Sequence, residues 1–158
     1  MIGKCLLETE GYKIFFEFKS LETSKQDVDL IVEFQLNPHL GGLVVKSIHS
    51  IFAIKDLERL INYFEEHIAC LKVDPDSESS IFISYGLGFQ VQALSGEVRS
   101  SSDGEFTMRF MVNVGQSDFA DSRTYVGGES EVTLENIKSF TSSLQRVLRE
   151  LSCVEAVL

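Results

Sequence analysis

The sequence predicts an α+β fold in which antiparallel sheets pack with two amphipathic helices, in the order strands, helix, strands, helix. Two observations predict it. Apolar and polar residues alternate near the start of the chain, as in half-buried strands, and this period of two then changes to the spacing of a helix. The same change occurs again in the second half. Runs of strands that each lead into one helix favour antiparallel sheets with the helices on one face.

The first strands are expected over residues 12–19 and 28–36, where apolar side chains occupy every second position. A turn over 37–42, which contains Pro38 and two glycines, leads to a third expected strand over 43–52. This third strand is apolar on both faces. It is therefore predicted to lie in the centre of its sheet.

An amphipathic helix is expected over 55–72, because apolar residues recur there at helical spacing. Strand-like alternation then returns in three segments, residues 81–93, 106–114 and 125–132. Loops are expected between these segments, at 95–96, 100–104 and 116–122. The pair Gly127 and Gly128 predicts a bulge or bend in the last strand. Thr133 is expected to cap a second helix, whose apolar stripe runs over 134–151.

The chain of 158 residues is expected to form a single domain over 1–158, since no Pro-rich or Ser-rich linker divides it and this length can bury a core. Its 24 acidic and 14 basic side chains give a net charge of −10. Such a chain is not expected to bind nucleic acid directly, because phosphate binding needs basic surface, and it does not suit an anionic membrane. It suits a basic partner.

No targeting segment or membrane span is expected. Glu8 and Glu10 interrupt the first apolar stretch, and no apolar run approaches the roughly 20 residues of a membrane span. The three cysteines Cys5, Cys70 and Cys153 are widely spaced, without a CxxC pair. They predict free thiols in a reducing cytoplasm, with one disulfide pairing left open by the sequence.

The sequence motifs do not point to an enzyme. The run 74–78 begins like a calcium loop, but Ser79 and Tyr85 occupy the positions of its glycine and glutamate. Residues 86–88, Gly-Leu-Gly, are too short for a dinucleotide fingerprint. The histidines do not have metal-binding spacing; they are His39, His49 and His67. We therefore expect no metal, no cofactor and no catalytic residue.

Acidic side chains are the candidate partner-binding residues: Glu65, Glu66, Asp74, Asp76, Glu78, Glu129 and Glu131. Glu65 and Glu66 have no Lys or Arg three or four residues away, so their own helix does not neutralise them. Glu129 and Glu131 share one strand face and extend the same sign of charge along an outer strand. Solvated surface is the ordinary alternative role for such residues.

Three segments of this chain carry a family resemblance. Residues 52–64 read like the helix entry "ELxxLIxxL" of small bacterial immunity proteins, and 80–89 resemble the strand pair that follows it. Residues 131–144 resemble the closing strand and its "xLxxFxxxLxxLL" helix. Over about 11–151 the chain is similar to the WapI-type immunity family of polymorphic toxin and contact-dependent inhibition systems. It departs from the family at 84–89, in place of an "EP-x-L-x-F" run, and at its last residues, which lack a Lys-Phe-Pro ending.

The resemblance implies inhibition by binding. Immunity proteins of this family sequester a toxin domain in the cytoplasm of the producing cell, and many such toxins are nucleases with basic clefts. The implied partner is therefore a cognate toxin C-terminal domain, bound by a monomer or weak dimer of this chain. Two other functions stay open. One is a small-ligand-binding or enzymatic domain with an unrecognised pocket, and the other is an assembly protein that self-associates through an exposed edge strand.

Overall fold

The computed structural model describes residues 3–21, 24–115 and 123–156. The first sheet has the strand order β1-β2-β3-β4, with β5 paired to the far end of β3, and every pairing is antiparallel. Its strands are β1 (Gly3–Glu8), β2 (Tyr12–Leu21), β3 (Ser24–Leu36), β4 (Val44–Lys46) and β5 (Ser50–Ala53). A short 3₁₀ helix, η1 (Pro38–Leu40), joins β3 to β4. We call this sheet A.

The second sheet, sheet B, is also antiparallel and has the order β6-β7-β8-β9. Its strands are β6 (Phe82–Ile83), β7 (Phe89–Val98), β8 (Gly104–Asn113) and β9 (Tyr125–Thr133). Sheet A leads into helix α1 (Ile54–Val73), and sheet B leads into helix α2 (Leu134–Ala156). The α+β class and the order strands, helix, strands, helix are therefore confirmed.

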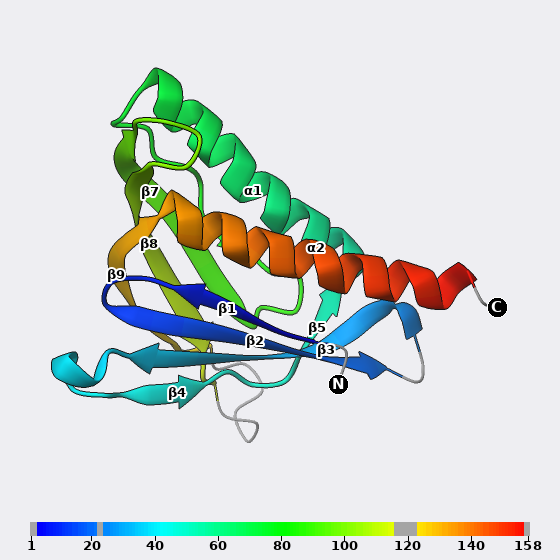
Figure 1. Ribbon diagram of the computed structural model, residues 1–158. Helices are drawn as coiled ribbons and strands as arrows, with labels where there is room; N and C mark the ends of the chain where they lie inside the picture. Colours follow the sequence, from blue (N-terminus) through cyan, green and yellow to red (C-terminus); the bar gives the residue numbers. More distant parts are fainter. Residues whose placement is uncertain (1–2, 22–23, 116–122, 157–158) are drawn as a thin grey trace.

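The two sheets cross, and their inner faces meet each other and the helices. Helix α2 lies against β1 and beside α1, and α1 packs on β7 (Figure 1). Phe16 of β2 is the meeting point, because its ring centroid lies 5.1 Å from Phe89 of β7, 5.9 Å from Phe110 of β8 and 5.1 Å from Phe140 of α2. One contiguous apolar core thus joins both sheets and both helices.

Both helices begin close to where their sequences predict, and α2 continues to Ala156, five residues beyond its expected stripe over 134–151. Helix α1 extends the expected 55–72 by one residue at each end, and its apolar stripe is buried. The hydroxyl oxygen of Thr133 accepts a hydrogen bond from the N–H of Asn136, 3.1 Å away, so Thr133 caps α2 as predicted. Strand β1 was not predicted. It alternates buried Cys5 and Leu7 with exposed neighbours and packs under α2.

The predicted central strand over 43–52 is wrong. The segment divides into β4 and β5, which pair with different parts of β3 at one edge of sheet A. Between them Ile48 donates its N–H to the carbonyl oxygen of Asn113 in β8, 2.9 Å away, and so leaves the sheet A ladder. The side chains of Val44 and Ile51 are each 53% exposed. In this segment, apolar residues on both faces therefore correspond to strands at the exposed edge of sheet A and not to a buried central strand.

The predicted strand over 81–93 is also interrupted. Between β6 and β7 the backbone of Leu87 has a φ of +60°, which an extended strand does not allow. Gly86 is needed because β5 passes close by: a Cβ atom on Gly86 would lie 2.3 Å from the carbonyl oxygen of Ile51. The expected loop at 95–96 is instead an irregularity within β7, where the register with β8 shifts between Ala93 and Gly96.

Of the bulge or bend predicted in the last strand, the bulge is wrong. Strand β9 pairs with β8 without any register shift, and Gly127 and Gly128 lie opposite Met111 and Phe110. The reason for Gly127 is close approach, because a Cβ atom there would lie 1.8 Å from the carbonyl oxygen of Phe110. The expected loop over 116–122 lies outside the described residues.

Candidate functional site

All seven predicted acidic residues are exposed, but they lie in three separate places. Glu65 and Glu66 are on α1, and Glu129 and Glu131 are on β9. Asp74, Asp76 and Glu78 belong to the loop between α1 and β6, which we call the acidic loop (residues 74–78). The sequence correctly placed these residues at the surface, and the fold decides which of them act together.

The acidic loop is fixed to β7 at both ends. Gly96 donates its N–H to the carbonyl oxygen of Pro75, 3.0 Å away, and Ser79 donates its N–H to the carbonyl oxygen of Ala93, 2.9 Å away. Within the loop, the Asp74 carboxylate accepts the N–H of Asp76 at 3.0 Å. These hydrogen bonds hold the loop beside the hairpin that joins β7 to β8.

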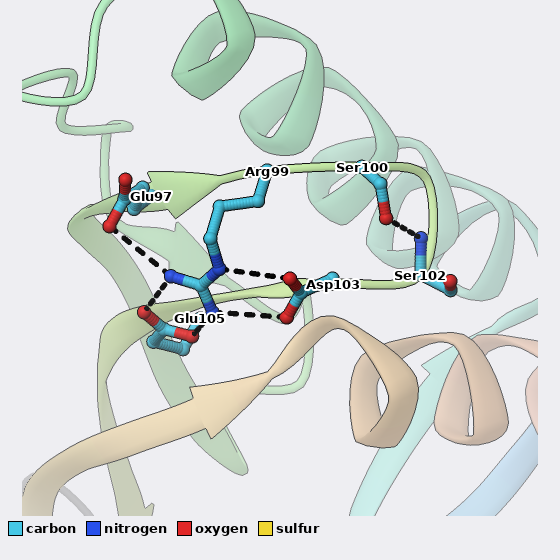
Figure 2. Close-up of polar contacts among 6 residues, drawn as sticks. All are labelled: Glu97, Arg99, Ser100, Ser102, Asp103 and Glu105. Atoms are coloured by element: carbon cyan, nitrogen blue, oxygen red, sulfur yellow. Dashed lines mark hydrogen bonds and ion pairs between the residues drawn. The ribbon is translucent and has the colours of Figure 1, made fainter.

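The tip of the β7–β8 hairpin carries a second group of acidic side chains, arranged around one arginine. Figure 2 shows the Arg99 guanidinium between Glu97, Asp103 and Glu105. Its Nε lies 3.0 Å from Asp103 Oδ2, its Nη1 lies 3.2 Å from Glu97 Oε2, and its Nη2 lies 2.5 Å from Glu105 Oε2. Glu97 and Glu105 are directly opposite each other across the strands, so Arg99 separates two like charges that would otherwise repel.

Arg99 also keeps this hairpin tip ionised. Hydrogen bonds from its guanidinium lower the pKa of Asp103 and that of Glu105 below their ordinary values. The bonds to Glu105 and Asp103 raise the pKa of Arg99 in turn. Three acidic side chains thus surround a single basic one, so the positive charge of Arg99 offsets only part of the charge at the hairpin tip.

The acidic loop and the hairpin tip form one surface, which we call the acidic end: Asp74, Asp76, Glu78, Glu97, Asp103 and Glu105. Glu131 extends it. Glu131 lies opposite Thr107 in the β8–β9 register, two pairs along from Glu105, so the two carboxylates are diagonal neighbours on the outer face of sheet B. Among the described residues, Arg99 is the one basic side chain paired with these groups.

Glu129 is neutralised, unlike Glu131. Arg109 of β8 lies directly opposite Glu129, and its Nη2 and Nε lie 2.7 and 3.0 Å from Glu129 Oε2. Arg109 Nη1 also donates to the side-chain oxygen of Gln92, 3.2 Å away. The uniform acidic strand expected from Glu129 and Glu131 is thus broken by a partner that only the strand register reveals.

Glu65 and Glu66 face different grooves although they are neighbours in sequence. Glu65 lines a groove of about 210 Å³ between α1 and α2, where Lys72 and Lys138 also lie. Glu66 lines a groove of about 310 Å³ between α1 and β6, with Arg59 at the far end. The sequence prediction considered only neighbours on the same helix, and it therefore omitted Lys138 of α2, which lines the same groove as Glu65.

The charge of the chain is concentrated in α1 and sheet B. Residues 54–133 contain 14 acidic and 6 basic side chains, so they contribute −8 of the net charge of −10. The remaining residues, which supply sheet A and α2, are close to neutral. The described part of this segment, which is α1, sheet B and their loops, contains 12 acidic and 6 basic side chains, and we call it the acidic half.

The histidines do not contribute to this surface. His67 is fully buried, and its two ring nitrogens bond Ser79 and Leu94. His49 is exposed and its Nδ1 lies 2.8 Å from Asp29 Oδ2. His39 lines a hollow of about 480 Å³ at one end of sheet A, with Lys13 and Asn37. No group of three or more His, Cys, Asp or Glu side chains is placed to hold a metal ion within residues 3–21, 24–115 and 123–156.

The cysteines are unpaired in the described structure. Cys5 is buried, and burial raises the pKa of its thiol to about 11, which makes it unreactive at neutral pH. Cys70 and Cys153 are exposed. In the part of the chain that the structure describes, neither helix is long and apolar enough to cross a membrane.

Sequence reasoning missed Glu97, Asp103 and Glu105. A signal was present, because Glu97, Arg99, Asp103 and Glu105 flank a serine-rich turn. The backbone hydrogen bond between Gly96 and Pro75 joins these residues to the acidic loop. The local sequence of neither segment predicts this contact.

The comparisons with known proteins give no functional assignment. No protein-family model matches the sequence, and no curated protein matches it. The structure of the plant transcriptional regulator PBF-2 is similar with a TM-score of 0.44 and 8% sequence identity, over 98% of this chain and 85% of that one. The crystal structure of WHY3 from Arabidopsis thaliana also has a TM-score of 0.44, with 11% identity over 98% of this chain and 91% of that one. At these values the similarities carry no argument about what this chain does.

Proposed function

We propose that this protein is an immunity protein, which binds and neutralises a basic toxin domain through its acidic half. The observation that carries the proposal is the acidic end, where three exposed carboxylates of the acidic loop lie beside three more that surround Arg99. Such a surface accelerates association with a basic cleft and matches its charge after docking. Inhibition of this kind needs no catalytic residue on the inhibitor.

The rigidity of the surface supports the same proposal. The acidic loop is held by backbone hydrogen bonds to β7, and the hairpin tip is held by the bonds from Arg99. Because the loop backbone and the carboxylates of Asp74, Glu97, Asp103 and Glu105 are already positioned, binding orders fewer groups and loses less conformational entropy. A preformed charged surface of this type suits fast and tight inhibition better than a flexible acidic tail does.

Co-expression tests the proposal. The C-terminal domain of the protein encoded immediately upstream of this chain is produced in bacterial cells with and without it, and both growth and co-purification are measured. Restored growth together with a stable complex is the expected result. A harmless domain, or growth without any complex, would contradict binding as the mechanism of immunity.

A small-ligand-binding role is the second candidate, and the hollow of about 480 Å³ at the end of sheet A favours it. Lys13, Asn37 and His39 supply polar groups along its wall, and Leu36 and Val44 supply apolar ones. Thermal stabilisation by a metabolite collection, lost in the Lys13→Ala variant, would support this role. That result would favour ligand binding in this hollow over partner binding at the acidic end.

A further inference from the structure

We infer that the groove between α1 and β6 is a receptor for an arginine side chain of the basic partner, with Glu66 as its counter-ion. The inference rests on the proposed function for the identity of the partner, but the groove itself can be tested without it. Its walls are the α1 side chains Arg59, Asn62, Tyr63 and Glu66 on one side and Ser80, Ile81 and Phe82 on the other. Together they enclose about 310 Å³.

The groove is preformed. Its helical wall uses positions 59, 62, 63 and 66, which lie along one face of α1. The Tyr63 hydroxyl joins the two walls, because it donates to the carbonyl oxygen of Ser80 at 2.7 Å and accepts the N–H of Ala93 at 2.9 Å. Binding there therefore does not require the walls to rearrange.

One end of the groove already holds a guanidinium group. Arg59 lies over the Phe82 ring, 4.6 Å from its centroid, and its Nη1 lies 2.5 Å from the buried Asp56 carboxylate. Its Nη2 lies 3.4 Å from the carbonyl oxygen of Ile83. The groove thus shows the elements of guanidinium recognition, an aromatic face, a carboxylate and a carbonyl oxygen, with this first position occupied by the chain's own residue.

The other end offers a carboxylate, that of Glu66, without a cation. Glu66 lies two helical turns from Arg59, which is about 10 Å along α1. In the described residues no Lys, Arg or His lies within ion-pair distance of its carboxylate. Asn62 and the Tyr63 ring lie between the two ends, and Ile81 is 50% exposed beside them. An arginine could therefore cover Ile81 with its aliphatic stem and direct its guanidinium to Glu66.

Glu65 provides the contrast and the matched control. It carries the same charge and is also exposed, but it shares its groove with Lys72 and Lys138. A cation attracted to Glu65 would meet two ammonium groups. Among the described residues that line the Glu66 groove, the one basic residue is Arg59, and its charge is already paired with Asp56.

The test is an NMR titration of the full chain with the blocked peptide Gly-Gly-Arg-Gly-Gly, followed by backbone amide shifts. Saturable shifts confined to residues 62–66 and 80–82 are expected. The Glu66→Gln variant should bind about tenfold more weakly, which is about 1.4 kcal/mol, and Glu65→Gln should bind as the wild type does. The lysine peptide should bind more weakly than the arginine peptide, and the isosteric citrulline peptide should not bind.

Three results would overturn the inference: no saturable binding, equal losses in the two variants, or shifts spread evenly over the acidic end. The proposed function is judged separately. Peptide binding in the groove without any complex with the toxin domain would leave the groove established and the immunity role contradicted. A toxin complex whose affinity is unaffected by Glu66→Gln would support the immunity role and contradict the use of the groove by the toxin.

Discussion

His67 and Leu94 are joined by a buried hydrogen bond, in which His67 Nε2 lies 2.8 Å from the Leu94 carbonyl oxygen. Because a carbonyl only accepts, Nε2 carries the proton, and Nδ1 then accepts from the Ser79 hydroxyl at 2.7 Å. The imidazole is 0% exposed and meets the Phe106 ring edge-on, 4.7 Å away. This neutral histidine ties α1 to β7 and to Ser79, the residue that follows the acidic loop.

The first prediction concerns the stability of this arrangement at low pH. Burial lowers the pKa of His67 below its ordinary value of 6.5. The unfolded chain therefore binds a proton more readily, so the free energy of unfolding should fall as the pH drops below about 6.5. Urea unfolding between pH 7.5 and pH 5 measures this decline. The decline should be largely absent in the His67→Gln variant and retained in the His39→Gln control. An equal decline in the wild type and both variants would exclude His67 as its cause.

The second prediction concerns the contact between the sheets. The hydroxyl of Tyr12 in β2 donates to the carbonyl oxygen of Met108 in β8, 2.7 Å away, and the tyrosine is buried. Tyr12→Phe leaves that carbonyl without this donor and should lower the free energy of unfolding by about 1–3 kcal/mol. Tyr85→Phe is the control, because Tyr85 is 82% exposed, and should change it by less than about 0.5 kcal/mol. Equal effects in denaturant melts would contradict the role of the Tyr12 bond.

The third prediction separates two adjacent glycines in β9. A Cβ atom at Gly127 would lie 1.8 Å from the carbonyl oxygen of Phe110, which is backbone and cannot easily move. At Gly128 the closest atom would be a ring carbon of Phe34 at 3.4 Å, which is ordinary contact. Gly127→Ala should therefore destabilise the fold by about 2 kcal/mol or more, and Gly128→Ala by less than about 1 kcal/mol. The reverse order of thermal stability would show that the β8–β9 register is wrong.

The fourth prediction concerns the hairpin tip. In Arg99→Gln the pKa of Asp103 and that of Glu105 should rise toward their ordinary values, because the guanidinium bonds that lower them are gone. Carboxyl-carbon NMR titrations measure both groups. Arg109→Gln is the control, since Arg109 pairs with Glu129 and should leave Asp103 unchanged. Unshifted titrations in Arg99→Gln would mean that the arginine does not organise this cluster.

The elements that sequence predicted well are those whose signal is local. The stripe over 55–72 and the cap at Thr133 depend on residues within a few positions of one another, and the structure places α1 and α2 accordingly. The strand over 43–52 was misjudged because exposure of Val44 and Ile51 depends on which strand lies alongside. Gly127 was recognised as structurally important, but the predicted reason, a bulge, is wrong. Glycine in a strand also occurs where another backbone approaches closely, and this is its role here.

For the candidate site too, the sequence predicts local properties of residues but not their long-range contacts. Exposure of the seven acidic residues followed from their charge and position in each element. Their grouping did not, because Arg109 reaches Glu129 through strand register and Lys138 reaches the Glu65 groove from the other helix. The hairpin carboxylates join the acidic loop through one backbone hydrogen bond between Gly96 and Pro75. Such contacts are products of the tertiary fold.

The measurement that tests the central claim most directly is the affinity of this chain for the upstream-encoded toxin domain at low and at high salt. The variant Asp74→Asn, Asp76→Asn, Glu78→Gln removes three charges from the acidic end, and Glu17→Gln, Asp29→Asn, Glu33→Gln removes three from sheet A. The account predicts that only the first variant loses tenfold or more in affinity at low salt, and that this loss shrinks as salt screens the charges. Equal losses in both variants, or affinity that salt does not change, would contradict a role for the acidic end in binding.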